Sequence, residues 1–236
     1  MKPAHAAVLL SLFAAALLLV AGPGTRLGWW DFRSGFVLMR WAAFGGLAAA
    51  ALAALMLALP RTRRAGAAPL LLALVIGLAV ALVPWSGLRQ ARAVPPIHDI
   101  TTDTTRPPAF VAVLPLRADA PNPAVYGGTE VAQAQVDAYP DLRPHRMAVA
   151  PAQAFDRALR AARAMGWEIV AADAAVGRIE ATDTTFWFGF KDDVVVRVEA
   201  DGSGSRVDVR SVSRVGGSDV GTNAKRIRAY LRALGT

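Results

Sequence analysis

The sequence predicts an α+β protein in which three transmembrane helices precede a two-layer sandwich, a four- to five-stranded antiparallel sheet with helices on one face. Two observations support this class. Residues 1–93 contain three long apolar runs, and residues 150–236 contain alternating strand patterns between two amphipathic helix patterns. The Pro-rich segment between them, residues 94–149, is expected to wrap the domain, so that 94–236 together form the soluble part.

The three apolar runs cover about residues 4–22, 38–59 and 69–86. Each reaches the roughly 20 residues that a helix needs to cross the hydrocarbon core. Trp29 and Trp30 follow the first run, where an aromatic belt lies at the membrane interface. We expect Pro60–Arg64 to be a short turn between the second and third helices.

A cleaved signal peptide is the alternative interpretation of the first run. Its basic start is Lys2 alone, and Val20–Pro23 is a poor small-x-small cleavage site. Both features favour a retained helix.

The net charge of +8 belongs to the membrane part of the chain. From Ile97 onward there are 17 basic and 17 acidic residues, whereas Asp31 is the only acid before Ile97. Basic residues that flank membrane helices orient them, so the charge does not indicate a nucleic-acid partner. The absence of cysteine excludes disulfides, thiolate catalysis and Cys-ligated metals.

The orientation is predicted from the shortest loop, which contains Arg61, Arg63 and Arg64. These residues favour a cytoplasmic N-terminus, although the basic residues on the two sides are nearly equal in number. We therefore expect a multi-pass protein of the plasma (inner) membrane whose soluble domain lies on the extracytoplasmic side.

The soluble part is expected to contain two helices around four strands, after a short helix (129–138) and a short strand (143–149) in the connecting segment. The first helix opens at Pro151 and stops at Gly166, which supplies a left-handed residue. Asp201–Gly204 indicates a hairpin turn. The expected strands are 167–172, 178–185, 190–200 and 206–212, and the last helix, capped by Ser218 or Asp219, buries Val220, Ala224, Ile227, Leu231 and Leu234.

Six charged residues and one threonine occupy the strand positions that face away from the helices. Such a face is usually solvated and stabilised by cross-strand pairs. The alternative is a docking surface for a polar partner or for the Pro-rich segment. The residues are Glu180, Thr182, Asp193, Arg197, Arg206, Asp208 and Arg210.

His98, Asp99 and Asp103 form the one cluster of His and carboxylates. A metal site needs three or four converging ligands, and Asp in a Thr-rich turn commonly bonds the local backbone, so we expect no metal and no cofactor. The alternative is a metal-dependent or hydrolytic envelope enzyme that uses these three residues and Asp192.

Asp192 and Asp193 are adjacent on an expected strand, so they point to opposite faces and cannot form a joint acid/base pair. Asp192 is expected to bond Ser211, Ser213 or a helix end. Gly216–Asp219 precedes a helix and is similar to an anion-binding turn, but the negative charge of Asp219 favours a helix cap.

Several motifs carry a resemblance to a known family. They are PPIHDITTDT with the following PPAF, YPDL, GWEI, FWFGFKDDVVVRV and RSVSRVGGSDVGTNAKRIR. With these motifs the soluble part resembles the bacterial and plastid domain-of-unknown-function family 1499, whose members often follow membrane helices. The resemblance implies no activity and only marks which residues merit testing.

The sequence thus predicts a membrane-anchored binding or interaction module rather than an enzyme, because no Ser-His-Asp order, phosphate loop or cofactor fingerprint is present. Its expected partners are the lipid bilayer and an envelope protein or ligand. The only support for a lipid-handling role is the aromatic cluster Phe186–Phe188. These residues are otherwise expected to belong to the protein core or to a rim that faces the membrane. The candidate binding residues are His98, Asp99, Asp103, Trp187, Asp192, Asp193, Arg197, Arg210, Arg214, Asp219 and Asn223.

Overall fold

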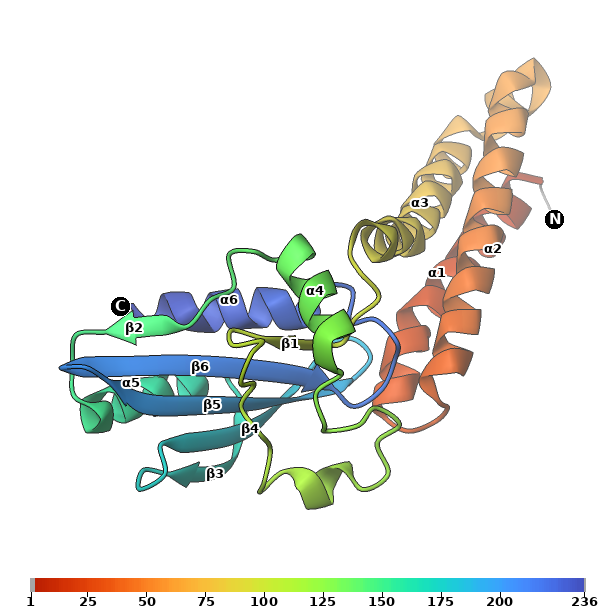
Figure 1. Cartoon of the computed structure of the whole chain (residues 1–236). Coiled ribbons are helices and arrows are strands. Elements are labelled where there is room, and N and C mark those ends of the chain that lie inside the picture. The colour runs from red at the N-terminus through yellow and green to blue at the C-terminus, as the bar shows by residue number, and fades with distance from the viewer. Residues whose placement is uncertain (1–2, 236) are drawn as a thin grey trace. The chain divides into compact units, whose positions relative to one another are not determined.

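A computed structural model describes residues 3–235, so Lys2 lies outside the described residues. The chain divides into two compact units (Figure 1). Unit 1 contains the chain up to Gln90 together with Phe186–Gly189, and unit 2 contains Ala91–Thr185 and Phe190–Thr236. The predicted class is confirmed, since three long apolar helices precede an α+β domain with an antiparallel sheet.

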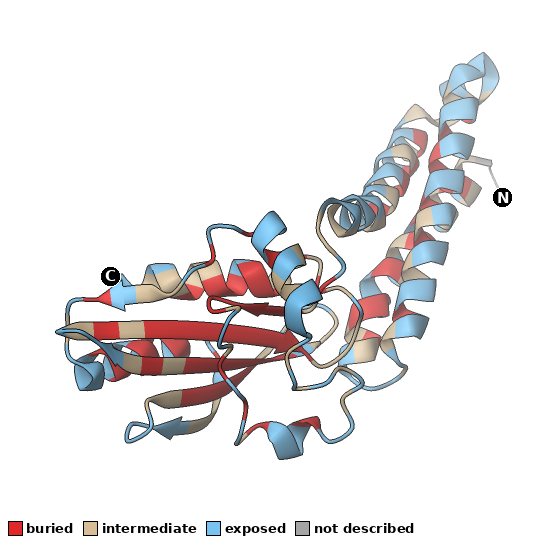
Figure 2. Cartoon of the chain, viewed as in Figure 1, coloured by how far each residue is buried: buried red, intermediate tan, exposed pale blue. Residues whose placement is uncertain are grey.

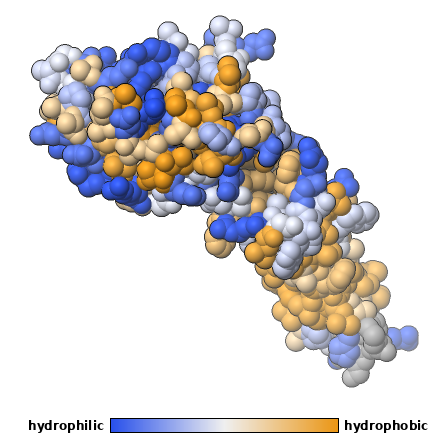
Figure 3. Space-filling view, turned by 90° about the horizontal axis from the view of Figure 1, so that it is seen from below, coloured by the Kyte–Doolittle hydropathy of each residue, from blue (hydrophilic) through white to orange (hydrophobic). Residues whose placement is uncertain are grey.

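Unit 1 consists of α1 (Pro3–Arg26), α2 (Phe32–Ala58) and most of α3 (Pro60–Ala93), with the loop Phe186–Gly189. All three helices are long and apolar enough to cross a membrane. Exposed Leu, Val and Phe side chains line them, and their surface is largely apolar in Figure 3. We therefore treat α1, α2 and α3 as membrane-spanning helices.

Small residues bring α2 and α3 together. A Cβ added at Gly77 would lie 2.4 Å from the carbonyl oxygen of Gly46, so only glycine permits this approach. The expected turn at Pro60–Arg64 is wrong, because α3 already begins at Pro60 and its helical path is interrupted at Gly66 (φ 174°, ψ 64°). Proline is tolerated at a helix start because its missing N–H has no partner there.

Unit 2 contains a six-stranded antiparallel sheet in the order β1-β6-β5-β4-β3, with β2 also paired to β6. Both short strands lie on the same edge of β6: β1 pairs with its residues Arg210–Val212 and β2 with Ser205–Val207. At the opposite edge, the register of β3 shifts between Ile169 and Ala171, which marks a bulge. The strands are β1 (Asp99–Thr101), β2 (His145–Met147), β3 (Glu168–Asp173), β4 (Arg178–Thr184), β5 (Lys191–Asp201) and β6 (Gly204–Ser213).

Helices α5 (Pro151–Ala164) and α6 (Thr222–Leu234) pack on β5, β6 and each other. Their apolar stripes meet the inward valines of the strands in one core, in which Trp167 stacks on Tyr230 with ring centroids 4.9 Å apart. Gly166 has φ +77°, as its role as helix stop requires. The start predicted for the last helix is wrong: Val220 (φ +55°) lies in the turn before α6.

The opposite face of the sheet is not solvated, so that prediction is wrong. The connecting segment covers it around the short helix η1 (Leu114–Arg117), whereas Val131 and Ala134 of the helix α4 (Gly128–Ala138) pack on the core of the other face. Glu180 and Asp193 have no exposed surface. Phe110 and Val113 pack on Val195 and Val212 beneath them. Figure 2 shows the resulting burial along β5 and β6. The alternative prediction, in which the Pro-rich segment docks on this face, agrees with the structure.

Candidate functional site

The covered sheet face contains a network of arginines and carboxylates. At one end, Asp193 accepts hydrogen bonds from Arg117 Nη1 (2.6 Å), from Thr182 Oγ1 (2.7 Å) and from Arg214, through Nε at 2.9 Å and Nη2 at 2.8 Å. Burial alone would raise the pKa of Asp193, but these hydrogen bonds and the charge of Arg214 outweigh it and lower the pKa. Asp193 is thus held as a carboxylate.

In the middle of the face, Arg210 forms a bidentate pair with Asp99, with distances of 2.9 Å and 2.7 Å. The same guanidinium donates to the carbonyl oxygens of Pro108 and Ala124, so it fastens two points of the connecting segment to β6. It also lies 5.4 Å from the ring centroid of Tyr126. Burial, together with the charge of Asp99, raises the pKa of Tyr126 to about 12.

At the other end, Asp103 accepts from Arg197 (2.9 Å) and Arg206 (2.5 Å). Its other oxygen accepts from the backbone N–H of Thr105 and Arg106, which closes the turn after β1. Although burial opposes it, these hydrogen bonds and the charge of Arg206 lower the pKa of Asp103. Both arginines also pair with buried Asp208.

Glu180 was predicted to lie on the charged sheet face but was not among the candidate binding residues. Its carboxylate is fully buried and accepts from the backbone N–H groups of Val111, Ala112 and Val113 at 2.9–3.0 Å. Arg178 Nε lies 3.0 Å from it. The sequence gives little indication of this role. A single Glu in a strand is normally expected to face solvent unless the segment that covers it is known.

The helix-covered face contains a second polar cluster around Arg226 of α6. Arg226 donates to Asp192 (2.6 Å), Asp183 (2.7 Å) and Ser211 (3.1 Å). Asp192 and Asp193 therefore point to opposite faces, as alternation requires. Asp192 was expected to bond Ser211, Ser213 or a helix end, and it accepts from Arg226, which lies five residues into α6. Asn223 joins the cluster by accepting from Ser211 Oγ at 2.7 Å.

Asp219 caps α6 from two residues before its N-cap, Gly221. Its two oxygens accept the N–H groups of Gly221 and Asn223, each at 2.8 Å. Burial, with a smaller contribution from the charge of Asp192, raises the pKa of Asp219 despite these bonds. A carboxylate thus occupies the place that the anion-binding alternative would give to a ligand.

The residues of the predicted His and carboxylate cluster do not converge. Asp99 pairs with Arg210 and Asp103 with Arg197 and Arg206, while His98 contributes its backbone carbonyl to Asn223. Within residues 3–235, no group of three His, Asp or Glu side chains could hold a metal ion. The metal-dependent alternative therefore has no ligand set in the described chain.

Trp187 belongs to unit 1, whereas the other candidate residues belong to unit 2. The loop Phe186–Gly189 packs there on the ends of α1 and α2. Arg26 Nη1 donates to the carbonyl oxygen of Phe186 at 2.9 Å, and the ring centroids of Phe36 and Phe188 are 5.1 Å apart.

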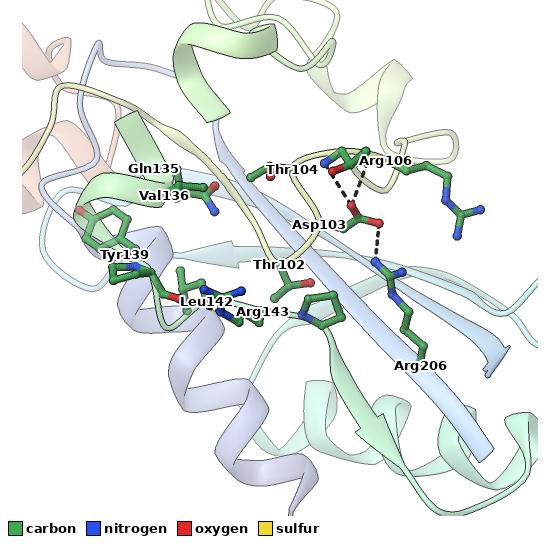
Figure 4. A pocket seen from close by; sticks show the side chains of 13 residues that line it. Thr102, Asp103, Thr104, Arg106, Gln135, Val136, Tyr139, Leu142, Arg143 and Arg206 are labelled. Carbon is green, nitrogen blue, oxygen red and sulfur yellow. Dashed lines mark hydrogen bonds and ion pairs between the residues drawn. The ribbon is translucent and has the colours of Figure 1, made fainter. Parts of the chain in front are cut away.

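A cleft of about 640 Å³ opens beside the Asp103 turn (Figure 4). We call it the Arg143 cleft. Arg143 bonds the carbonyl oxygen of Pro140 through Nε (3.1 Å) and, within the described chain, forms no ion pair. Arg206 lies at the other side, paired with Asp103. The cleft is lined by Thr102–Arg106, Gln135, Val136, Tyr139, Pro140, Leu142–Pro144 and Arg206.

One of three comparisons with known proteins finds a match for this chain. No curated protein and no solved structure matches it. A protein-family model described as "Protein of unknown function (DUF1499)" matches residues 99–234, which include every strand of the sheet and helices α4, α5 and α6. With more than half of its length matched, the chain belongs to the DUF1499 family.

Proposed function

We propose that residues 94–236 are a non-catalytic binding module, held on the extracytoplasmic side of the plasma (inner) membrane, and that the Arg143 cleft binds a small molecule with an anionic group and an apolar body. The cleft carries this proposal. Its volume falls within the roughly 300–1,000 Å³ of small-molecule sites. Val136, Tyr139 and Leu142 supply apolar walls, and Arg143 supplies a cation that has no acidic partner among residues 3–235.

The paired carboxylates support a binding role over a catalytic one. A general acid or base must reach a substrate with a proton to exchange. Asp99, Asp193 and Glu180 are instead buried and saturated by arginines or backbone N–H groups that hold the connecting segment. These carboxylates therefore stabilise the fold and are not placed to exchange a proton with a substrate.

The test uses the full chain purified in detergent and three probes: benzoate, phenyl phosphate and the uncharged benzamide. A ligand that binds only the folded state raises the unfolding temperature as its concentration rises. We expect a rise with at least one anion and none with benzamide. Arg143→Gln should abolish the rise, whereas Arg146→Gln, an exposed residue outside the cleft, should retain it. No rise with either anion, or an equal rise in Arg143→Gln, would refute the proposal.

The orientation is tested separately with two reporters fused to the C-terminus. Alkaline phosphatase folds into an active enzyme only in an oxidising compartment, and green fluorescent protein exported in unfolded form stays dark. An active phosphatase and a dark fluorescent fusion support an extracytoplasmic domain. The reverse pair of results places the domain in the cytoplasm.

A further inference from the structure

The loop Phe186–Gly189 is fixed to the same helix ends that carry the interfacial tryptophans. Trp29 and Trp30 follow α1, and Trp29 is 65% exposed. Trp and Arg side chains at the ends of membrane helices lie at the level of the lipid headgroups. Arg26 ends α1 at this level and donates to the carbonyl oxygen of Phe186.

Glycines on the helices make room for the loop's aromatic rings. A Cβ added at Gly22 would lie 1.9 Å from Trp187 Cδ1, and one added at Gly35 would lie 2.8 Å from Phe188 Cε1. Trp187 and Phe188 therefore rest directly on the backbone of α1 and α2. Three consecutive residues of the loop are thus held by three separate contacts.

Phe186 itself turns outward and is 86% exposed, the highest value among the exposed large hydrophobic side chains. Its carbonyl oxygen accepts from Arg26, the last residue of α1, and the chain continues from there to Leu27, which is 63% exposed, and Trp29. Phe186 thus adds exposed apolar surface to unit 1, whose helices expose Leu, Val and Phe side chains. An aromatic ring in this position fits the boundary between headgroups and acyl chains.

We propose that Phe186 inserts into the headgroup region of the bilayer that unit 1 spans, so that the β4–β5 loop is a membrane contact in addition to the helices. The occupant of this surface is lipid. The alternatives, water or a second protein surface, are outcomes that the experiment distinguishes.

The chain has no cysteine, so a single substitution provides a unique labelling site. Phe186→Cys is labelled with a nitroxide in the full chain, reconstituted in vesicles of phosphatidylethanolamine and phosphatidylglycerol. Accessibility is measured by electron paramagnetic resonance with oxygen, which concentrates in lipid, and with a nickel chelate, which stays in water. Leu27→Cys is the interfacial reference. Val176→Cys is the matched control, a 55% exposed residue in the turn before β4, whereas Phe186 follows β4.

We expect the ratio of oxygen to nickel-chelate accessibility at Phe186 to match that at Leu27 and to exceed that at Val176 several-fold. A ratio equal to that at Val176 would show that water surrounds the side chain and would overturn the proposal. Low accessibility to both reagents would show that protein covers it, with the same consequence.

Discussion

At the scale of single residues, Asp193 has no exposed surface, and its partner Arg117 has a side chain only 3% exposed. Asp193→Ala leaves Arg117 and Arg214 without their counter-charge. Breaking a buried pair in this way costs about 3–5 kcal/mol. We expect a loss of that size in the free energy of unfolding of the full chain in detergent, followed by near-ultraviolet circular dichroism.

Asp201→Ala is the matched control for this substitution. Asp201 also pairs with an arginine, but Arg146 is 77% exposed. An exposed pair contributes less than about 1 kcal/mol. Equal losses in the two variants would contradict a buried network at Asp193.

The same carboxylates predict a dependence on pH. The pKa values of Asp193 and Asp103 lie below their ordinary value of 3.8, so both groups stabilise the fold fully above that pH. The stabilisation is lost as the pH falls through the lower folded pKa values. Asp219 opposes this trend, because its raised pKa favours the protonated form in the folded state.

Unfolding temperatures measured from neutral pH to below 3.8 should therefore fall at the acid end. The fall should be smaller in Asp193→Ala, which lacks one of the titrating groups. An acid dependence of equal size in both proteins would show that Asp193 does not titrate as a paired carboxylate.

The sequence predicts the sheet face toward which a side chain points, but it does not predict the residue with which that side chain pairs. Alternation along β5 is enough to send Asp192 and Asp193 to opposite faces. Their partners Arg226 and Arg117 lie 34 and 76 residues away in the chain, and no local pattern specifies such a pairing. Asp99, Asp103 and Arg210 were recognised as candidates, but their structural role required the register of β1 on β6.

At the scale of elements, substitutions at two turn glycines distinguish the cost of backbone strain from the cost of a steric clash. Gly177 and Gly202 both have positive φ, but a Cβ at Gly177 would lie 2.1 Å from the carbonyl oxygen of Val198, whereas nothing lies within 4 Å at Gly202. Left-handed backbone costs a residue with a Cβ about 1–2 kcal/mol, and overpacking adds about 1–3 kcal/mol.

Gly202→Ala should therefore lower the free energy of unfolding by about 1–2 kcal/mol, and Gly177→Ala by about 2–5 kcal/mol. Denaturant unfolding of the full chain measures both. If Gly177→Ala were no worse than Gly202→Ala, the close approach of this turn to β5 would be wrong.

The connecting segment depends on Glu180 as its anchor. Glu180→Gln keeps the shape of the side chain but removes the charge that three backbone N–H groups share. Hydrogen bonds to charged groups contribute about 1.5–3 kcal/mol, so the amide hydrogens of Val111–Val113 should exchange about tenfold faster or more. Hydrogen exchange with mass spectrometry measures this, and Glu199→Gln, at a side chain 34% exposed, should leave these amides unchanged.

Elements were predictable where their pattern was long. The strands β3, β4, β5 and β6 and the helix α5 appear within a few residues of their expected positions, because alternation and helical spacing repeat over many residues. The strand β1 was missed, since three residues in a Pro- and Thr-rich segment show no period. Pro60–Arg64 read as a turn for a similar reason: proline and arginine mark a helix start as readily as a loop.

At the scale of the whole molecule, the equal numbers of acidic and basic residues after Ile97 take on a structural meaning. Composition alone showed a neutral domain, and a solvated charged face was the natural interpretation. The structure places many of these charges inside, between the sheet and the connecting segment. A sequence does not reveal this, because burial depends on a cover that comes from a distant part of the chain.

The three apolar helices predict how the protein fractionates. The full chain should stay in the membrane pellet after alkaline carbonate, which strips proteins held by charge or by partners, because the helices are embedded in hydrocarbon. Detergent should release it. Recovery of the intact chain in the carbonate supernatant would show that the helices do not span the bilayer.

The bulge in the edge strand β3 affects how copies of this protein can associate within a membrane. Proteins confined to a membrane collide far more often than proteins in free solution, and an unpaired, regular edge strand could pair with the sheet of a neighbouring copy. The break between Ile169 and Ala171, with exposed Glu168 and Asp173 at the strand ends, makes that union unfavourable. We therefore expect the sheets of neighbouring copies not to pair through β3 in a crowded membrane.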